Sequence, residues 1–162
     1  ISNNFATNAD SYYAQCLGGG VSIIDSFSYD NEEVVSEILF DSCVFAKNSI
    51  SEFGSGAFGA GIGSVGFASN VEQSIVISGC KFYDNNLVRS DGSPSSNGPA
   101  ALHHQSSYYC GANYSLIIDD CDFRLHTTGN TVINSIENSC TVGTNQIQDS
   151  LFLLLILCEI KN

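Results

Sequence analysis

The fold is decided by a block of eight residues that occurs four times, most clearly as Ile75-Val76-Ile77-Ser78-Gly79-Cys80-Lys81-Phe82. Each copy has three apolar residues, two variable ones, a cysteine, any residue, and then Phe or Ile. The other copies span residues 38–45, 116–123 and 153–160. The aligned cysteines are 37, 41 and 37 residues apart. A period of about 40 residues is typical of repeat proteins, in which each repeat packs on its neighbours.

The residues inside each copy predict a bend. Cys43 and Phe45 are two residues apart and share one face of a strand, whereas Phe40 lies an odd number of residues from Cys43. A single straight strand would therefore point Phe40 away from the other two. Because Ser, Gly and Asp favour bends, we expect the chain to turn at Asp41-Ser42 and at the matching pairs of the other copies.

Glycine-rich or small-residue stretches separate the copies at residues 18–20, 59–61 and 98–101, and residues 131–136 are the best match in the fourth period. Each period thus holds about three short strand-like segments and no helical pattern long enough to fill it. We predict an all-β fold, a right-handed parallel β-helix of about four coils. It forms a single domain over residues 1–162, which is complete or a segment of a longer array.

Equivalent positions of successive coils should superpose into interior columns. The expected core ladder consists of Cys43, Cys80, Cys121, Cys158, Phe45, Phe82, Phe123 and Ile160. Phe5, 40 residues before Phe45, marks a partial fifth copy. Three copies have an Asn three residues after the aromatic position, namely Asn8, Asn48 and Asn85, and the fourth has His126. We expect these Asn residues to end a strand, to bond at the turn through their amides and to tolerate left-handed geometry.

The F-x-x-N motif at residues 5–8, 45–48 and 82–85 alternates with a Gly-Gly-Ala-Ile-like motif at residues 19–21 and 59–62. This pattern resembles the repeats of chlamydial-type polymorphic outer membrane proteins and, more broadly, right-handed parallel β-helix proteins of the pectate-lyase-like superfold. The resemblance covers nearly the whole chain. It implies a secreted or surface-displayed β-helix, often adhesive, such as the passenger segment of an autotransporter.

Composition narrows the choice of partners and compartment. The chain has 17 acidic and 5 basic residues and a net charge of −12, which disfavours nucleic acid and anionic membrane surfaces. The apolar run at residues 151–157 is far shorter than the ~20 residues that span a bilayer, so we predict a strand there and no membrane span. Seven cysteines suggest an extracellular or cell-surface location. Asn113 begins an N-glycosylation triplet.

Three groups of residues are candidates for a catalytic or metal-binding role, and each can also be explained by a structural role. For the cysteine column the alternatives are a disulfide ladder, a metal-thiolate site and a buried apolar stack, and we favour the buried stack. Cys16, Cys110 and Cys140 lie outside the column and are better disulfide candidates. The carboxylates at 119, 120 and 122 could serve as calcium ligands, as a general acid and base pair, or only as a solvated turn. We favour the turn, because an enzyme that acts on polyuronates needs cationic side chains and this chain has few. His103-His104 lacks matching metal ligands.

We therefore predict no catalytic residue, cofactor or metal, and an extracellular structural or adhesive module rather than an enzyme. The alternative is a carbohydrate-active β-helix, that is, a fragment of a polysaccharide lyase or glycoside hydrolase. Uncapped coils expose unpaired backbone groups, which predicts end-to-end self-assembly into a filament or packing against adjacent coils of a longer chain. The expected assembly surface is Phe5, Leu154, Ile156 and Leu157, with an outward lateral column of Leu39, Val76, Ile117 and Leu154. Glycans are a further candidate partner.

Overall fold

The computed structural model describes residues 1–7, 16–24, 34–52, 57–65, 71–89, 91–93, 95, 99–105, 113–124, 126, 131–136, 142–148 and 151–153. Their regular elements are β-strands, and no helix in this part of the chain could cross a membrane. In chain order the strands are β1 (Phe5–Thr7), β2 (Cys16–Leu17), β3 (Val21–Ile24), β4 (Val34–Asp41), β5 (Val44–Ala46), β6 (Ser49–Glu52), β7 (Ala57–Phe58), β8 (Ile62–Val65), β9 (Val71–Ser78), β10 (Lys81–Tyr83), β11 (Asn86–Arg89), β12 (Pro99–Gln105), β13 (Asn113–Asp119), β14 (Asp122–Arg124), β15 (Thr131–Ile136), β16 (Val142–Gln148) and β17 (Leu151–Leu153).

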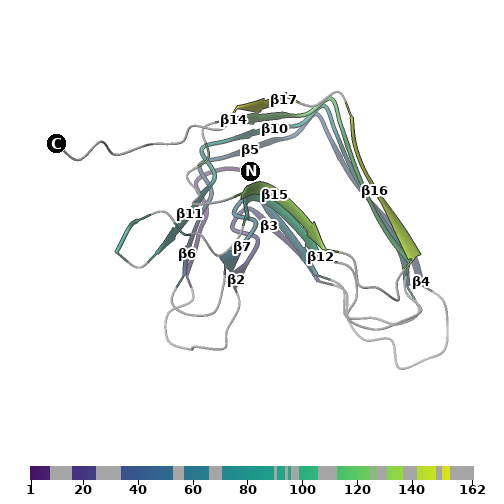
Figure 1. Ribbon diagram of the computed structural model, residues 1–162, viewed down its shortest axis with the longest axis horizontal. Coiled ribbons are helices and arrows are strands. Elements are labelled where there is room, and N and C mark those ends of the chain that lie inside the picture. The colour runs from purple at the N-terminus through teal and green to yellow at the C-terminus, as the bar shows by residue number, and fades with distance from the viewer. Residues whose placement is uncertain are drawn as a thin grey trace.

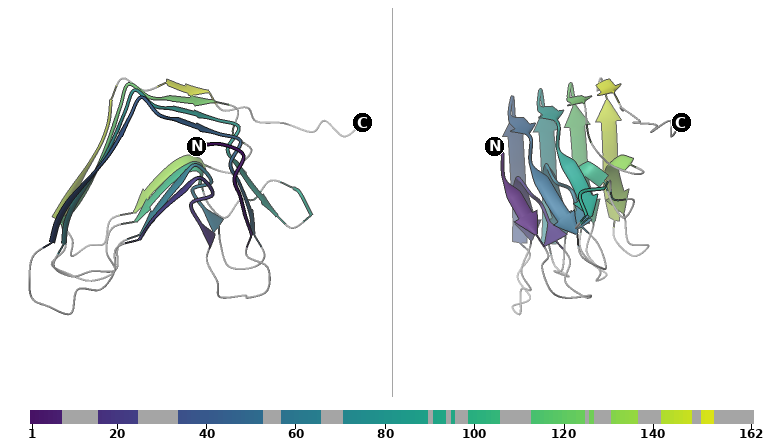
Figure 2. Two further views of the ribbon diagram at one scale, coloured as in Figure 1. Left: turned by 180° about the vertical axis from the view of Figure 1, so that it is seen from behind. Right: turned by 90° about the vertical axis from the view of Figure 1, so that its left-hand side faces the viewer.

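These strands stack into five sheets that the chain visits in a fixed order (Figure 1). Sheet I contains β4, β9, β13 and β16, and sheet II contains β5, β10, β14 and β17. Sheet III contains β1, β6 and β11, sheet IV contains β2 and β7, and sheet V contains β3, β8, β12 and β15. Each pairing is parallel and joins one coil to the next, so the coils stack from the N-terminal to the C-terminal end (Figure 2). The predicted parallel β-helix is confirmed.

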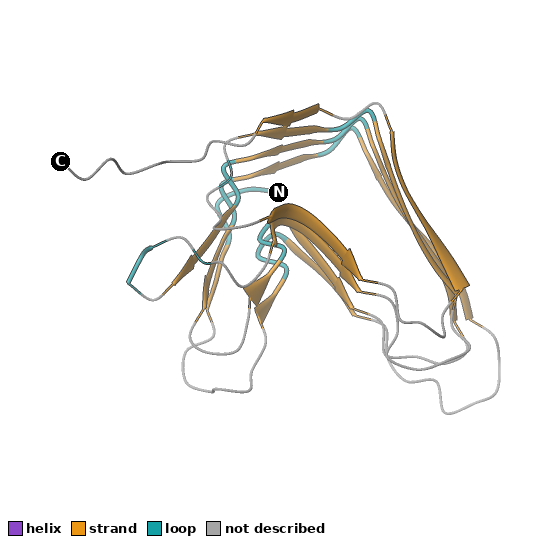
Figure 3. Ribbon diagram, viewed as in Figure 1, coloured by secondary structure: helices purple, strands orange, loops and turns teal. Residues whose placement is uncertain are grey.

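The predicted bend lies between sheets I and II, where loops connect β4 to β5, β9 to β10 and β13 to β14 at one corner (Figure 3). Ser42, Gly79 and Asp120 occupy this corner and have positive φ angles of 52°, 59° and 48°. A left-handed residue reverses the direction of the next side chain, so the residues before and after the corner both face inward. Backbone bonds from Ser42 N–H to the Ser78 carbonyl and from Gly79 N–H to the Asp119 carbonyl continue the stacking through the bend.

The main core lies between sheets I, II and V and is built from columns of equivalent residues. Phe45, Phe82 and Phe123 are paired in register and buried, with ring centroids 4.7 Å and 4.6 Å apart in parallel stacks. A smaller cluster, Ile50, Leu87, Ala60 and Ala100, lies between sheet III and the start of sheet V. Three of the predicted aromatic positions therefore form the expected column.

The glycine-rich motifs before sheet V are required by the close approach of successive coils. A Cβ on Gly61 would lie 2.4 Å from the Ala101 carbonyl oxygen, and one on Gly20 would lie 2.6 Å from the Gly61 carbonyl oxygen. Distances this short would force the backbones apart. Residues 131–136 form β15 in sheet V, with Ile133 opposite Leu102, so the predicted match in the fourth coil is confirmed.

The predicted register of the fourth copy is wrong. Phe152, and not Ile160, pairs with Phe123, and β16 supplies the strand opposite β13. In sequence, Asp149-Ser150 precedes Leu151 as Asp120-Cys121 precedes Asp122, so this coil aligns on Phe152 and not on the cysteine. Cys158 and Ile160 lie outside the described residues.

The first copy is also in a different register from the predicted one. Phe5 pairs with Ser49 in sheet III, whereas Ser2 forms the bridge to Ala46. The offset between the first two turns is therefore 44 residues, and Phe5 does not belong to the column of Phe45. Asn4 occupies the position predicted for Asn8, which lies outside the described residues.

Candidate functional site

A ladder of buried asparagine side chains joins the coils at the corner between sheets II and III. Asn48 and Asn85 are fully buried, and each precedes a strand of sheet III. The Oδ1 of Asn85 accepts bonds from the backbone N–H and the Nδ2 of Asn48, at 3.1 and 3.0 Å. The Oδ1 of Asn48 accepts the same pair from Asn4, at 3.2 and 3.0 Å. The asparagines therefore serve the turn structurally, as predicted.

The left-handed residue at this corner is the one before each asparagine. Asn3, Lys47 and Asp84 have φ angles of 58°, 56° and 53°. The left-handed geometry that we expected at Asn48 and Asn85 therefore falls one residue earlier. This places Lys47 and Asp84 at the outer corner of the helix.

His126 continues the ladder in the next coil. Its Nδ1 lies 3.3 Å from the Asn85 backbone nitrogen and 3.2 Å from the Asn85 carbonyl oxygen. An unprotonated Nδ1 accepts the Asn85 N–H as an asparagine Oδ1 would. The departure of His126 from the F-x-x-N pattern therefore keeps the acceptor that the ladder needs.

The cysteine column is a stack of thiols bonded to backbone carbonyls, in which Cys80 and Cys121 are buried and Cys43 is half-buried. Cys80 Sγ donates to the Phe40 carbonyl and Cys121 Sγ donates to the Asp119 carbonyl, at 3.3 and 3.2 Å. Burial raises the pKa of Cys80 to about 11 and raises that of Cys121 above its ordinary value. Cys43, Cys80 and Cys121 are thiols and not disulfides, and a protonated buried thiol is a poor nucleophile and metal ligand. The arrangement supports the apolar-stack interpretation.

The remaining predicted candidates are separated from one another. Cys16 lies in β2 opposite Ala57, and Asn113 begins β13 in the middle of sheet I. Cys110 and Cys140 lie outside the described residues. Asp120 is exposed at the bend, whereas Asp122 belongs to sheet II. Within the described ranges, no three His, Cys, Asp or Glu side chains are grouped closely enough to hold a metal ion.

The histidines are buried, and this predicts acid sensitivity. Burial lowers the pKa of His103 and of His104 to about 4, and it also lowers the pKa of His126. The unfolded chain takes up protons near pH 6.5, so between about 6.5 and 4 protonation favours unfolding. Lowering the pH from 7.5 to 5.5 should reduce the free energy of unfolding by about 1 kcal/mol for each of His103 and His104, and His126 should add to the loss.

Urea unfolding at the two pH values measures this loss. The variant His104→Phe retains an aromatic ring near Tyr114 and should show a smaller loss than the parent chain, because one titrating group is removed. Equal stability of the parent chain at both pH values would contradict the burial of these side chains.

The outer face of sheet II gathers cations from three successive coils. Outward residues flank the inward phenylalanine of each strand, and the register places Lys81 between Val44 and Asp122, and Tyr83 between Ala46 and Arg124. Lys47 follows Ala46 at the corner, where its N–H donates to the Tyr83 carbonyl. Lys47, Lys81, Tyr83, Asp84, Asp122 and Arg124 line an open depression of about 470 Å³, which we call the basic depression.

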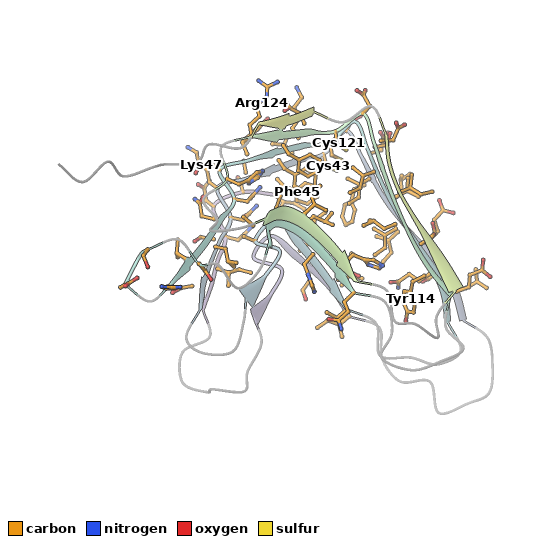
Figure 4. The ribbon with its side chains drawn as sticks, in the orientation of Figure 1. Cys43, Phe45, Lys47, Tyr114, Cys121 and Arg124 are labelled. Carbon is orange, nitrogen blue, oxygen red and sulfur yellow. The ribbon has the colours of Figure 1, made fainter. Side chains whose placement is uncertain are left out.

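Its charged groups are accessible, and part of their charge is unpaired. Lys47, Lys81 and Arg124 are exposed, and Figure 4 shows Lys47 and Arg124 pointing away from the core. The Nε of Arg124 lies 2.6 Å from Oδ1 of Asp122, and Asp84 Oδ1 accepts a bond from Asn86 Nδ2. Lys47 and Lys81 have no ion-pair partner among the described residues. The depression therefore combines a central aromatic ring with available positive charge.

Sequence reasoning counted these cations but did not bring them together. Lys47, Lys81 and Arg124 are three of the five basic residues of the chain and are widely spaced in sequence. The sequence contains the information needed, because the residues before and after each inward phenylalanine point to the outer face of the same strand. The register of the first three copies was enough to place Lys81 and Tyr83 on one strand and Arg124 on the next.

The predicted assembly surface is only partly described. Leu39, Val76 and Ile117 share an outward register, but Gln146 and not Leu154 follows them. Leu154, Ile156 and Leu157 lie outside the described residues. The large exposed apolar side chains in the described part of the chain all lie within residues 1–44: Ile1, Ile24, Val35, Leu39 and Val44. End-to-end association stays a prediction.

The resemblance to polymorphic outer membrane protein repeats also stays a prediction. What the structure shows is a parallel β-solenoid with a repeating coil. Comparison of the chain with known protein families, with curated proteins and with solved structures found no match.

Proposed function

We propose that this chain is an extracellular, non-catalytic adhesive module, a parallel β-helix that binds glycans through the basic depression. The observation that supports this is the convergence of Lys47, Lys81 and Arg124 around Tyr83 in a chain whose net charge is −12. Sugar-binding sites commonly present an aromatic ring to the apolar face of the sugar, with a few polar groups that fix its orientation. The extracellular location is supported by the resemblance of the repeats to those of surface-displayed proteins.

A carbohydrate-active enzyme is the alternative function, and the pairing of the carboxylates favours simple binding. Asp122 is held by Arg124 at 2.6 Å, and Asp84 accepts a bond from Asn86. A general acid or base must reach the proton that it transfers. These two carboxylates instead bond neighbouring side chains: Asp122 orients Arg124, and Asp84 bonds Asn86 at the corner between sheets II and III.

Binding of the chain to a glycan array tests the proposal. We expect the parent chain to bind at least one class of glycan, and we expect Tyr83→Ala to weaken that binding about tenfold or more, because the central ring is lost. Arg89→Gln is the control, since Arg89 is exposed on β11 and does not line the depression. Absence of binding to every glycan would overturn the proposal.

Catalysis is tested separately by incubation with polyuronates and calcium. We expect the chain length of the polysaccharide to stay constant and no unsaturated product to form. Formation of unsaturated or shortened products would support the enzyme alternative.

A further inference from the structure

We propose, on the basis of the glycan-binding function above, that the basic depression selects acidic sugars and binds the carboxylates of a uronic acid chain. The saccharide lies along the helix axis and crosses the outer face of sheet II.

The distribution of charge points to an anionic ligand. Three of the five basic side chains line one depression, although the chain as a whole carries a net charge of −12. Positive charges that lie near one another repel, and the repulsion falls when an anion binds between them. Asp84 and Asp122 also line the depression, so its net charge is +1; Asp122 is paired with Arg124, whereas Lys47 and Lys81 have no ion-pair partner in the described part of the chain. A neutral sugar would gain little from these two ammonium groups.

The register gives each side chain a distinct position around the ligand. Tyr83 lies in the centre, with the methyl group of Ala46 on one side along the column and Arg124 on the other. The short Ala46 leaves room beside the ring for a sugar. Asp122 engages the Nε of Arg124, so the terminal amino groups are left to receive a carboxylate through two parallel bonds.

The spacing of the coils indicates that the ligand has more than one charged unit. Lys47 follows β5, Lys81 lies on β10 and Arg124 lies on β14, so the cations belong to three adjacent strands of sheet II. Adjacent strands are about 4.8 Å apart, and the three cations therefore span about 10 Å along the axis. One carboxylate cannot reach all three. A chain of uronic acids can, and its second and third contacts form at high effective concentration.

The experiment compares matched acidic and neutral ligands by calorimetry at low salt. The probes are trimers derived from polygalacturonate, alginate and hyaluronate, each tested as the free acid and as the methyl ester, with galacturonic acid as the monomer. We expect at least one free-acid trimer to bind, its ester to bind about tenfold more weakly or worse, and the monomer to bind more weakly than the trimer. Affinity should fall as salt rises from about 50 to about 300 mM.

Charge-removing variants locate the site. Lys81→Gln and Arg124→Gln should each weaken binding of the acidic trimer about fivefold to tenfold, while Arg89→Gln, which removes the same charge outside the depression, should change it less than about twofold. Unchanged circular dichroism spectra confirm that each variant is folded. An equal effect of Arg89→Gln would show that net charge and not the depression determines binding, and would overturn the proposal.

The outcomes separate this inference from the proposed function. If esters or neutral array glycans bind as tightly as the acids, or if sulfated glycans bind and uronates do not, the uronate inference is wrong and the glycan-binding function stands. If no glycan of any kind binds, both are wrong.

Discussion

Replacing Phe82 by alanine is expected to lower the free energy of unfolding by about 3–5 kcal/mol, because a fully buried ring is removed from the middle of a stack. Its ring centroid is 4.7 Å from that of Phe45 and 4.6 Å from that of Phe123, so the cavity would face two aromatic neighbours. Backbone pairing on both sides of β10 restricts the collapse that could fill it. Urea denaturation followed by circular dichroism measures the change.

Lys81→Ala is the matched control for this substitution. Lys81 precedes Phe82 on the same strand, but its side chain is exposed on the outer face. Its removal should change the free energy of unfolding by about 0.5 kcal/mol or less. Similar effects of the two substitutions would contradict the assignment of inward and outward faces in sheet II.

Replacing Asn85 by leucine should destabilise the chain by a similar amount, about 3–5 kcal/mol, through the loss of hydrogen bonds and not of volume. The Asn85 amide accepts two bonds from Asn48 and donates one to the Phe45 carbonyl at 2.9 Å. All of these groups lie in the interior, where an unpaired donor or acceptor is costly. Thermal and urea unfolding of the variant measure the loss.

Asn85→His provides a test that separates hydrogen bonding from packing. His126 occupies the equivalent position of the next coil and bonds through Nδ1, so a histidine at position 85 can keep the acceptor. We expect it to lose less stability than Asn85→Leu. A leucine variant as stable as the parent chain would show that the asparagine ladder does not hold the coils together.

The sequence was sufficient to predict the β-helix and the register of the middle coils. Phe45, Phe82 and Phe123 alternate with bend residues at offsets of 37 and 41 residues, and offsets of this kind leave one way to stack the coils. The bend at Ser42, Gly79 and Asp120 followed from the same parity argument, since only a reversal of side-chain direction places both flanking segments inward.

The first and fourth coils could not be placed from the sequence because the alignment depended on single conspicuous residues. Cys158 matched the cysteine column, yet Phe152 is the residue that pairs with Phe123. Phe5 matched the aromatic position, yet the asparagine ladder selects Asn4 as the partner of Asn48. A buried hydrogen-bonding ladder constrains the register more strongly than a small apolar side chain, because a misplaced amide leaves its partners unpaired.

The basic depression was missed because it depends on two facts that the sequence does not state together. The cations lie on outward positions, which the inward columns do not constrain. They also converge only when both offsets between successive coils, 37 and 41 residues, are applied, because these offsets place β10, with Lys81 and Tyr83, between β5 and the strand of Arg124. The count of five basic residues suggested too little positive charge for an acidic ligand, whereas their positions bring most of that charge into one place.

The most direct test of the account is an NMR titration of the isotope-labelled chain with the uronate trimer that binds most tightly. The basic depression predicts that the largest amide shifts fall on β10, β14 and the corner at Lys47, where the three coils present their cations. The amides of sheets I and V should shift little. Shifts centred on the outer face of sheet I, with Lys81, Tyr83 and Arg124 unmoved, would contradict the proposed site.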